Sequence, residues 1–309
     1  MWYDQGLSVY TILASGVTAR TYTAAGLYSA ITYKFKVKAR NSVGYSDFSS
    51  PVSILAAQIP DVPLAPTTTI SDRWNVVINW VAPYNGGTPI TSYTIEIRTK
   101  DSSIYFIDSL DCNGSNSLIV AEKKCTVKVA TLRVSPFLIP WGQGVYARII
   151  ATNYLGSSAA SEAGNGAVLL TFPDEPINLS NNLSITWGTT IGLTWDEGDK
   201  NGGTPVIDYT VMSLSSDSST YIERQVGVVG TSVTLNGFNL GITYTFKVKS
   251  RNSFDFSVGY SNEVSILAAK NPNQPNKPII SIDNMNVLID WTAPINNGSP
   301  ITSYIILIR

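Results

Sequence analysis

Apolar and basic residues alternate strictly along Tyr33–Asn41, and a near copy of this stretch recurs at Tyr244–Asn252. In the first stretch the odd positions from 33 to 39 are apolar and the even positions from 34 to 40 are lysine or arginine. A period of two residues is typical of a half-buried β-strand, which turns one side to a core and the other to solvent. The pattern predicts that other strands of the chain pack around these two.

The first 57 residues contain four strand-like runs, one of which includes the first stretch. They are Ser8–Leu13, Ala19–Thr23, Ile31–Asn41 and Pro51–Ala57. Leu27 precedes Tyr33 by six residues, and Asn41 is followed by Gly44 and Ser46. This spacing resembles the second half of a fibronectin type III domain. The resemblance implies a tyrosine corner, in which the Tyr33 hydroxyl bonds to the backbone between strands E and F.

The same resemblance continues to the end of the chain. Trp80 and Tyr93, then Trp195 and Tyr209, then Trp291 and Tyr304 match the tryptophan of strand B and the tyrosine of strand C. Val145 takes the tyrosine-corner position in the second copy, so the corner hydrogen bond is not expected there. We predict an all-β fold, a linear array of tandem fibronectin type III (immunoglobulin-like) β-sandwiches. Its repeats are repeat 1 (1–57, a C-terminal half), repeat 2 (58–170), repeat 3 (171–270) and repeat 4 (271–309, an N-terminal half).

The sequence period spans two repeats. The residue pairs 35 and 246, 80 and 291, and 90 and 301 are each identical and each separated by 211 positions. Short repeats therefore alternate with long ones that carry a cysteine-bearing insertion, and such an array is built of units that mainly contact their neighbours. The long type resembles the fibronectin arrays in large surface or secreted proteins of protists.

The two half-repeats need a covering partner. Residues 1–57 are expected to lack strands A, B and C, and residues 271–309 to contain little else. Their apolar faces could be covered by strand donation between molecules or by the rest of a longer array. Because joining them would combine two repeat types, we expect a longer covalent chain. The absence of a signal peptide at the start is consistent with a segment of a larger protein.

Composition argues against catalysis and against nucleic-acid binding. The chain has no histidine, 14% charged residues and a net charge of −1. It also lacks a phosphate-binding loop, a Gly-x-Ser-x-Gly motif and an Arg-Gly-Asp motif. No apolar run is long enough to span a bilayer. We predict a protein that is not an enzyme and has no cofactor, catalytic residue, metal site, nucleic-acid partner or membrane span in this segment.

Two cysteines, Cys112 and Cys125, lie close together in the insertion. Two thiols without histidine fall short of an ordinary zinc site, which favours a local disulfide and an oxidising compartment. Such a loop gains about 3 kcal/mol in the chain-entropy model.

Four Asn-x-Ser sequons are candidates for N-glycosylation. They begin at Asn113, Asn178, Asn182 and Asn297. Asn113 is the best candidate, because it lies in a polar loop beside Cys112, and Pro300 weakens the sequon of Asn297.

Two surface features have more than one interpretation. The basic stripe on the outer face of strand F is either a binding site for acidic glycans or, as we favour, the solvated face of an antiparallel sheet. Its residues are Lys34, Lys36, Lys38 and Arg40 in the first stretch and Lys247, Lys249 and Arg251 in the second. Trp74, Trp187 and Met285 each lie in an A–B turn, where they either cap their own core or pack on the adjacent repeat.

The leading functional hypothesis is a structural subunit of an extracellular rod or filament, located outside the cell or at its surface. Its partners are neighbouring repeats of the same or identical chains, with covalent glycans as additional groups. The alternative is a cell-surface adhesion or recognition module that binds a protein or glycan through its loops. A third, weaker hypothesis is an accessory array of an enzyme.

Overall fold

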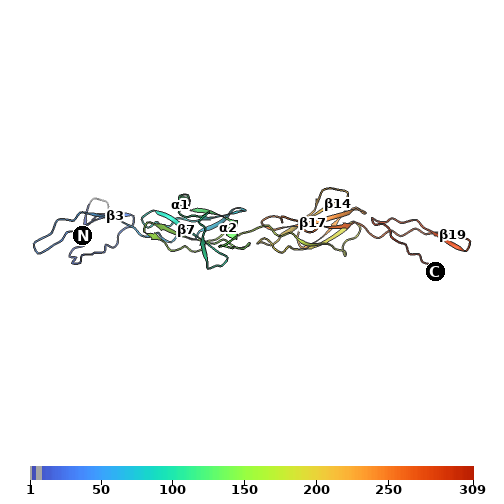
Figure 1. Cartoon of the computed structure of the whole chain (residues 1–309), viewed down its shortest axis with the longest axis horizontal. Helices are drawn as coiled ribbons and strands as arrows, with labels where there is room; N and C mark the ends of the chain where they lie inside the picture. The colour runs from blue at the N-terminus through green and yellow to red at the C-terminus, as the bar shows by residue number, and fades with distance from the viewer. Residues whose placement is uncertain (1, 5–8) are drawn as a thin grey trace. The chain divides into compact units, whose positions relative to one another are not determined.

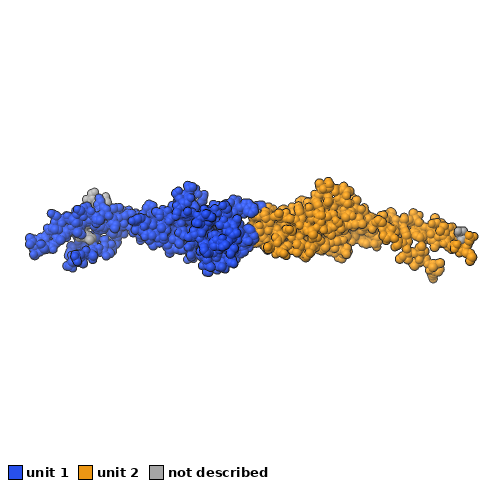
Figure 2. Space-filling view, viewed as in Figure 1, with its two compact units in different colours: residues 1–169 blue, residues 170–309 orange. Residues whose placement is uncertain are grey.

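The computed structural model describes residues 2–4 and 9–309, drawn in Figure 1. The chain forms two compact units, residues 1–169 and 170–309 (Figure 2). Each unit contains one complete sandwich and one half-repeat.

Repeat 2 is a sandwich of two antiparallel sheets, with strand orders β5-β6-β9 and β11-β10-β7-β8. The strands are β5 (Thr67–Asp72), β6 (Asn75–Asn79), β7 (Ile90–Arg98), β8 (Tyr105–Ile107), β9 (Lys124–Lys128), β10 (Ala147–Asn153) and β11 (Gly156–Ser157). Alternate residues of β7 and β10 are buried and meet those of β6 and β9 in one core. The insertion adds two short helices, α1 (Ser117–Glu122) and α2 (Val129–Arg133).

Repeat 3 has the same two-sheet plan, with strand orders β12-β13-β16 and β15-β14-β17-β18. The strands are β12 (Ile177–Asn181), β13 (Thr190–Asp196), β14 (Asp208–Ser215), β15 (Ile222–Val228), β16 (Ser232–Asn236), β17 (Thr243–Arg251) and β18 (Val264–Leu267). The second alternating stretch is β17, in which every second residue from Tyr244 to Ser250 is buried, as its period predicts.

Repeat 1 is a single sheet of strand order β2-β1-β3-β4. Its strands are β1 (Trp2–Asp4), β2 (Thr11–Ile12), β3 (Ile31–Lys36) and β4 (Val52–Ala56). Strand β1 pairs with β3 as β14 pairs with β17, so the expectation that residues 1–57 contain no part of strand C is wrong. Without an opposing sheet, the inward-facing Val37 is 50% exposed.

The predicted strand Ala19–Thr23 is absent, and Ser8 of the run Ser8–Leu13 lies outside the described residues. The reason is visible in repeat 3, where the corresponding strand β16 takes its place in the sheet by pairing with β13, the second strand of the repeat. Repeat 1 offers no such partner among its described residues, so the backbone of 19–23 has nothing to pair with.

Repeat 4 begins with an antiparallel hairpin of β19 (Ile279–Asp283) and β20 (Asn286–Asp290). Trp291 then meets Tyr304 edge to face, with ring centroids 5.2 Å apart. The matching pairs Trp80–Tyr93 and Trp195–Tyr209 show nearly the same geometry, at 5.2 and 5.4 Å. Residues 301–309 form no strand, because strand C pairs with a later strand in the complete repeats.

Candidate functional site

By the lettering of the predicted strands, B, C and F are β6, β7 and β10 in repeat 2 and β13, β14 and β17 in repeat 3. Strand F of repeat 1 is β3, and strand G of repeat 3 is β18. The linkers that lead into repeats 2, 3 and 4 are hydrogen-bonded to the B–C loop of the repeat they enter. In repeat 2, the Gln58 amide donates to the Gly86 carbonyl (2.8 Å) and the Asp61 amide to the Tyr84 carbonyl (3.0 Å). The same two bonds recur from Thr171 to Gly202 and from Asp174 to Lys200, and again from Lys270 to Asn297 and from Asn273 to Ile295. We call this pair of hydrogen bonds the linker clamp.

An asparagine at the end of strand F strengthens the clamp in both complete repeats. Asn153 Nδ2 donates to the carbonyl oxygens of Gln58 (2.7 Å) and Asn85 (2.9 Å). Its Oδ1 accepts from two amides of the F–G turn, those of Leu155 and Gly156. Asn252 makes the corresponding four bonds in repeat 3. Each side chain is buried and ties linker, B–C loop and F–G turn together.

In repeats 2 and 4, the next residue of the B–C loop contacts the preceding repeat. Gly87 and Gly298 both have a φ of +94°, a conformation that favours glycine. A β-carbon on Gly87 would lie 2.5 Å from the Ala30 nitrogen, and one on Gly298 would lie 2.4 Å from the Gly241 nitrogen. Each glycine therefore lets two backbones approach more closely than any side chain allows. We call the linker clamp and this glycine contact together the joint.

The joint was missed by the sequence prediction, although the sequence contains its signal. Asn-Gly-Gly-Thr-Pro occurs at 85–89 and at 201–205, and Asn-Gly-Ser-Pro occurs at 297–300. A recurrence in every B–C loop could have indicated a shared backbone role rather than a turn of ordinary composition.

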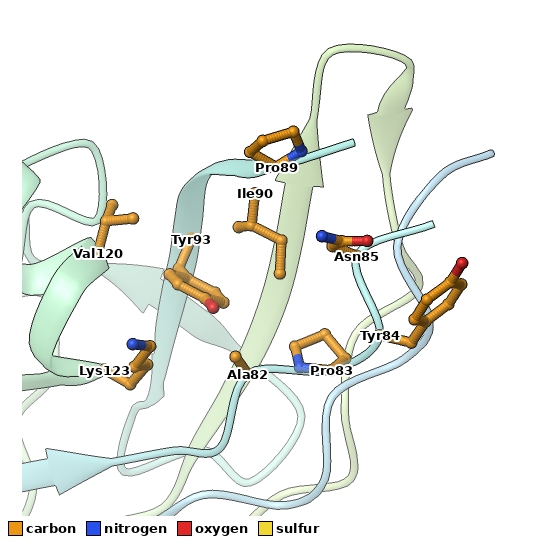
Figure 3. A pocket seen from close by; sticks show the side chains of 9 residues that line it. All are labelled: Ala82, Pro83, Tyr84, Asn85, Pro89, Ile90, Tyr93, Val120 and Lys123. Atoms are coloured by element: carbon orange, nitrogen blue, oxygen red, sulfur yellow. The ribbon is translucent and has the colours of Figure 1, made fainter. Parts of the chain in front are cut away.

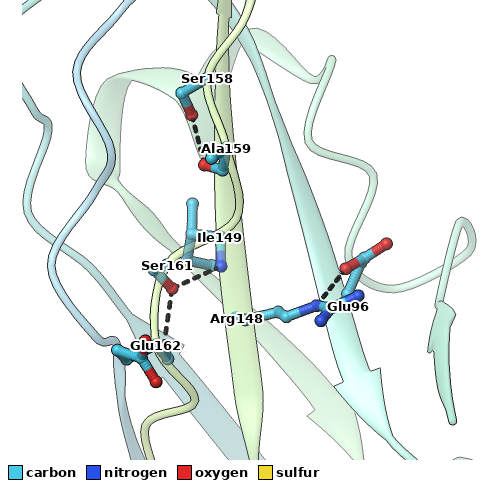
Figure 4. Close-up of polar contacts among 7 residues, drawn as sticks. All are labelled: Glu96, Arg148, Ile149, Ser158, Ala159, Ser161 and Glu162. Atoms are coloured by element: carbon cyan, nitrogen blue, oxygen red, sulfur yellow. Dashed lines mark hydrogen bonds and ion pairs between the residues drawn. The ribbon is translucent and has the colours of Figure 1, made fainter.

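A second recurring feature joins strand F to the segment that follows the F–G turn. Ser161 Oγ accepts from the Ile149 amide at 3.0 Å, and Ser158 Oγ accepts from the Ala151 amide at 3.0 Å. Each hydroxyl then donates to the next carbonyl along the chain, as Figure 4 shows. Equivalent serine bonds to strand F amides are made by Ser46 and Ser49 in repeat 1 and by Ser257 and Ser261 in repeat 3.

The basic stripe of strand F contacts aromatic rings. In repeat 3, Lys247 Nζ lies 3.8 Å from the ring centroid of Tyr221 and 4.3 Å from that of Tyr260. The Tyr221 hydroxyl donates to Glu263 Oε1 (2.6 Å). Partial burial, this hydrogen bond and the negative charge of Glu263 raise the pKa of Tyr221 to about 12. At the other end of the stripe Arg251 pairs with Asp208, which raises the pKa of the guanidinium.

The tyrosine corners follow the predicted distribution. The Tyr33 hydroxyl accepts from the Tyr28 amide at 2.9 Å, and the Tyr244 hydroxyl accepts from the Asn239 amide at 3.1 Å. In repeat 2, Val145 is buried at this position, and its carbonyl instead accepts from the Thr68 hydroxyl.

The predicted disulfide joins Cys112 to Cys125, and both residues are buried in the core of repeat 2. It fixes the loop before α1 against β9. The loop is also pressed onto strand β7, because the Tyr93 amide donates to the Gly114 carbonyl at 3.0 Å.

A shallow groove of about 490 Å³ lies between α1 and the B–C loop of repeat 2 (Figure 3). The Tyr84 and Asn85 that line it also belong to the joint, and Lys123 supplies its one cation. The remaining lining residues are Ala82, Pro83, Pro89, Ile90, Tyr93 and Val120.

The four sequons lie in different environments. Asn113 is exposed, and its Oδ1 accepts from the Ser115 amide. Asn178 is exposed but Nδ2 donates to Asp196, and Asn182 is half-buried with Oδ1 bonded to Ser184. Asn297 is only 8% exposed, and its Nδ2 donates to the Asn271 carbonyl and to Asn273 Oδ1. A glycan on that nitrogen would break both hydrogen bonds to the linker, so the structure argues against Asn297 as an acceptor.

The A–B turn residues are on the surface. Trp74, Trp187 and Met285 are each more than half exposed, so none of them caps the core of its own repeat. Within residues 2–4 and 9–309 there is no cluster of three or more potential metal-binding side chains. In the same part of the chain no helix has the length and apolar character needed to cross a bilayer.

Comparison with known proteins adds the family context. No family model matches the chain. Fibronectin type-III domain-containing protein 3A of Pongo abelii is 24% identical over 284 residues, covering 91% of this chain and 23% of that protein. The sheets, the tyrosine corners and this similarity agree. The fold is a tandem of fibronectin type III sandwiches.

Two further similarities concern proteins with several domains. Cell adhesion molecule Dscam1 of Drosophila melanogaster is 22% identical over 271 residues, or 84% of this chain and 12% of Dscam1. The crystal structure of chicken CNTN1 FN1-FN3 domains covers 78% of this chain and 77% of that chain, at 17% identity and a TM-score of 0.34. The chain thus spans less than a quarter of the length of either curated relative named here.

Proposed function

We propose that this chain is a non-enzymatic structural segment of a tandem fibronectin type III array, located outside the cell or at its surface. The observation that carries the proposal is the joint, whose linker clamp recurs at three linkers. Its role is to hold consecutive repeats in a defined orientation, so that the array acts as a spacer or a filament element.

The joint removes the freedom that a linker normally has. Domains in one chain move relative to each other by default unless their interface constrains them. Here the linker is bonded at two positions three residues apart, and in repeats 2 and 3 a buried asparagine bonds it again. The prolines at 60, 63 and 66 further limit the backbone of the linker into repeat 2.

Similarity to a protein named a cell adhesion molecule supports the location. Dscam1 is named a cell adhesion molecule, and the disulfide of repeat 2 is typical of an oxidising compartment.

A second candidate function is adhesion through the loops. The observation that favours it is the exposure of apolar side chains next to the F–G turns, where Tyr154 is 87%, Val43 93% and Val258 81% exposed. An exposed aromatic or aliphatic side chain on a turn is available to a protein partner.

The joint can be tested by replacing Gly298 with alanine in the full chain. Spin labels at Thr234 on β16 and Ser281 on β19 would report the distance across the joint. Gly237→Ala is the matched control, because Gly237 also has a positive φ (+83°) but has no atom within 4 Å of its β-carbon position.

We expect a narrow distance distribution in the wild-type chain and in Gly237→Ala, and a broad one in Gly298→Ala. A broad distribution in the wild-type chain would overturn the proposal and leave the loop-adhesion candidate as the better one.

A further inference from the structure

Rings and cations alternate along the outer face of strand F in repeat 3. The series runs Tyr221, Lys247, Tyr260, Lys249, Phe256 and Arg251. The cation-to-centroid distances along it are 3.8, 4.3, 5.9, 4.2 and 5.3 Å. All five distances lie within the range of about 6 Å at which a cation is attracted to an aromatic face. We call this series the aromatic–cation ladder.

Repeat 1 carries the same ladder. Its members are Tyr10, Lys36, Phe48, Lys38, Tyr45 and Arg40, at successive distances of 3.9, 4.3, 4.9, 4.4 and 5.3 Å. The order of ring, lysine and arginine is identical in the two short repeats. Repeat 2 has Ser157 and Ala160 where repeat 1 has Tyr45 and Phe48, and so it lacks the two rings that follow the turn.

The ladder spans the part of strands F and G where regular pairing is missing. Strand β18 pairs with β17 only from Thr243 to Phe246. Beyond that point the Val248 and Ser250 amides donate to the hydroxyls of Ser261 and Ser257. In return, the Ser261 and Ser257 amides donate to the Val248 and Ser250 carbonyls. The rings of Phe256 and Tyr260 come from this same segment, so the ladder holds it against strand F where these isolated bonds replace a continuous strand pairing.

Strand G leads directly into the joint. The Ala268 carbonyl accepts from the Gly241 amide (2.9 Å), and it would lie 2.9 Å from a β-carbon on Gly298. Tension applied along an array passes through this strand into the next repeat. The ladder therefore lies in the path of the load.

We propose that the aromatic–cation ladder locks strand G onto strand F in the short repeats and so resists its detachment under tension. This role rests on the proposed structural function of the array. It also offers a third interpretation of the basic stripe, besides glycan binding and solvation, because each lysine of the ladder lies between two aromatic rings.

The test is a double-mutant cycle of Lys247→Met and Tyr260→Leu in the full chain. The readout is the amide hydrogen exchange of Val248 and Ser250, which reports opening of this part of strand G. Lys277→Met and Tyr154→Leu are the controls, since both side chains are exposed and neither belongs to a ladder.

We expect each variant to accelerate exchange at these two amides by about two- to fivefold per lost contact. The double variant should accelerate exchange less than the product of the two single effects, because the variants share one contact. Pulling the full chain by its ends should show one unfolding event shifted to lower force in the ladder variants and unshifted in the two controls.

Unchanged exchange, or single effects that multiply without coupling, would overturn the lock. Faster exchange throughout repeat 3 would also overturn it, since the effect would then be global. The label distance across the joint is independent of this readout. Both proposals are supported if a ladder variant keeps a narrow distance distribution across the joint and shows faster exchange at Val248 and Ser250. A broad distance distribution in the wild-type chain refutes only the structural function.

Discussion

Asn252 Nδ2 donates to the Thr171 carbonyl oxygen at 2.9 Å and thereby fastens the end of strand F to the linker that opens the same repeat. The two residues are 81 positions apart, and the asparagine is 3% exposed. The buried side chain of Asn252 donates to two backbone carbonyls and accepts from two backbone amides, so its replacement leaves some of these groups without a partner.

We expect Asn252→Asp to destabilise repeat 3 by about 2–3 kcal/mol, because an oxygen would then face the carbonyl oxygens of Thr171 and Asn201. Urea unfolding of the full chain measures the change. Asn236→Asp is the control, since Asn236 is exposed and only accepts from Thr190. Equal stability of the two variants would show that the side-chain hydrogen bonds of Asn252 do not stabilise the repeat.

Tyr244→Phe should destabilise repeat 3 by about 1 kcal/mol, the usual contribution of one hydrogen bond. The variant removes the hydroxyl that accepts from the Asn239 amide and leaves the edge-to-face contact of the ring with Phe238 in place. In repeat 2, Tyr146→Phe should have no effect, because Tyr146 sits one position after the corner with its ring under Arg98. Thermal unfolding of both variants distinguishes the two positions.

The sequence predicted the corners and the Trp–Tyr pairs because these depend on residue type at a fixed spacing. Tyr33, Tyr244 and Val145 were assigned correctly from their distance to the asparagine that ends strand F. The run at 19–23 was assigned wrongly, since a strand also needs a pairing partner that propensity does not reveal.

The joint and the ladder could not be derived in the same way. The joint depends on the close approach of backbone atoms from two repeats. Gly87 and Gly298 have no side chain whose chemistry could indicate such a contact in the sequence. The ladder depends on how Phe256 and Tyr260 return across the F–G turn, which alternation within strand F does not specify.

The raised pKa of Tyr221, about 12, predicts an alkaline transition. Because the folded value exceeds the unfolded value of about 10, the neutral phenol stabilises the fold in full below pH 10. That contribution declines as the pH rises from 10 through 12. Glu263→Gln removes the charge and should move the pKa down towards 10, which a spectroscopic titration of tyrosinate detects. An unchanged midpoint would mean that Glu263 does not act on this phenol.

Loss of the disulfide should destabilise repeat 2 and leave repeat 3 unchanged. Replacing both Cys112 and Cys125 with alanine removes a 13-residue loop closure, for which about 3 kcal/mol is expected. Unfolding monitored by hydrogen exchange separates the repeats. Peptide mapping without reduction should recover the two cysteines in one cross-linked species, and two alkylatable thiols in native protein would contradict the assignment.

The sequons should differ in occupancy when the chain passes through a secretory pathway. Asn113 is exposed and has no described acceptor for its Nδ2, so a glycan fits there without loss of a contact. Asn297 uses the same atom for two hydrogen bonds inside the joint. We therefore expect the Asn113 peptide to carry added mass and the Asn297 peptide to be bare.

Ser115→Ala should abolish the first modification, whereas Ser299→Ala should change neither the mass nor the label distance across the joint. A glycan occupies the Nδ2 atom that makes these two bonds. Added mass at Asn297 in folded protein that keeps a narrow distance distribution across the joint would therefore show that the joint does not need the Nδ2 bonds.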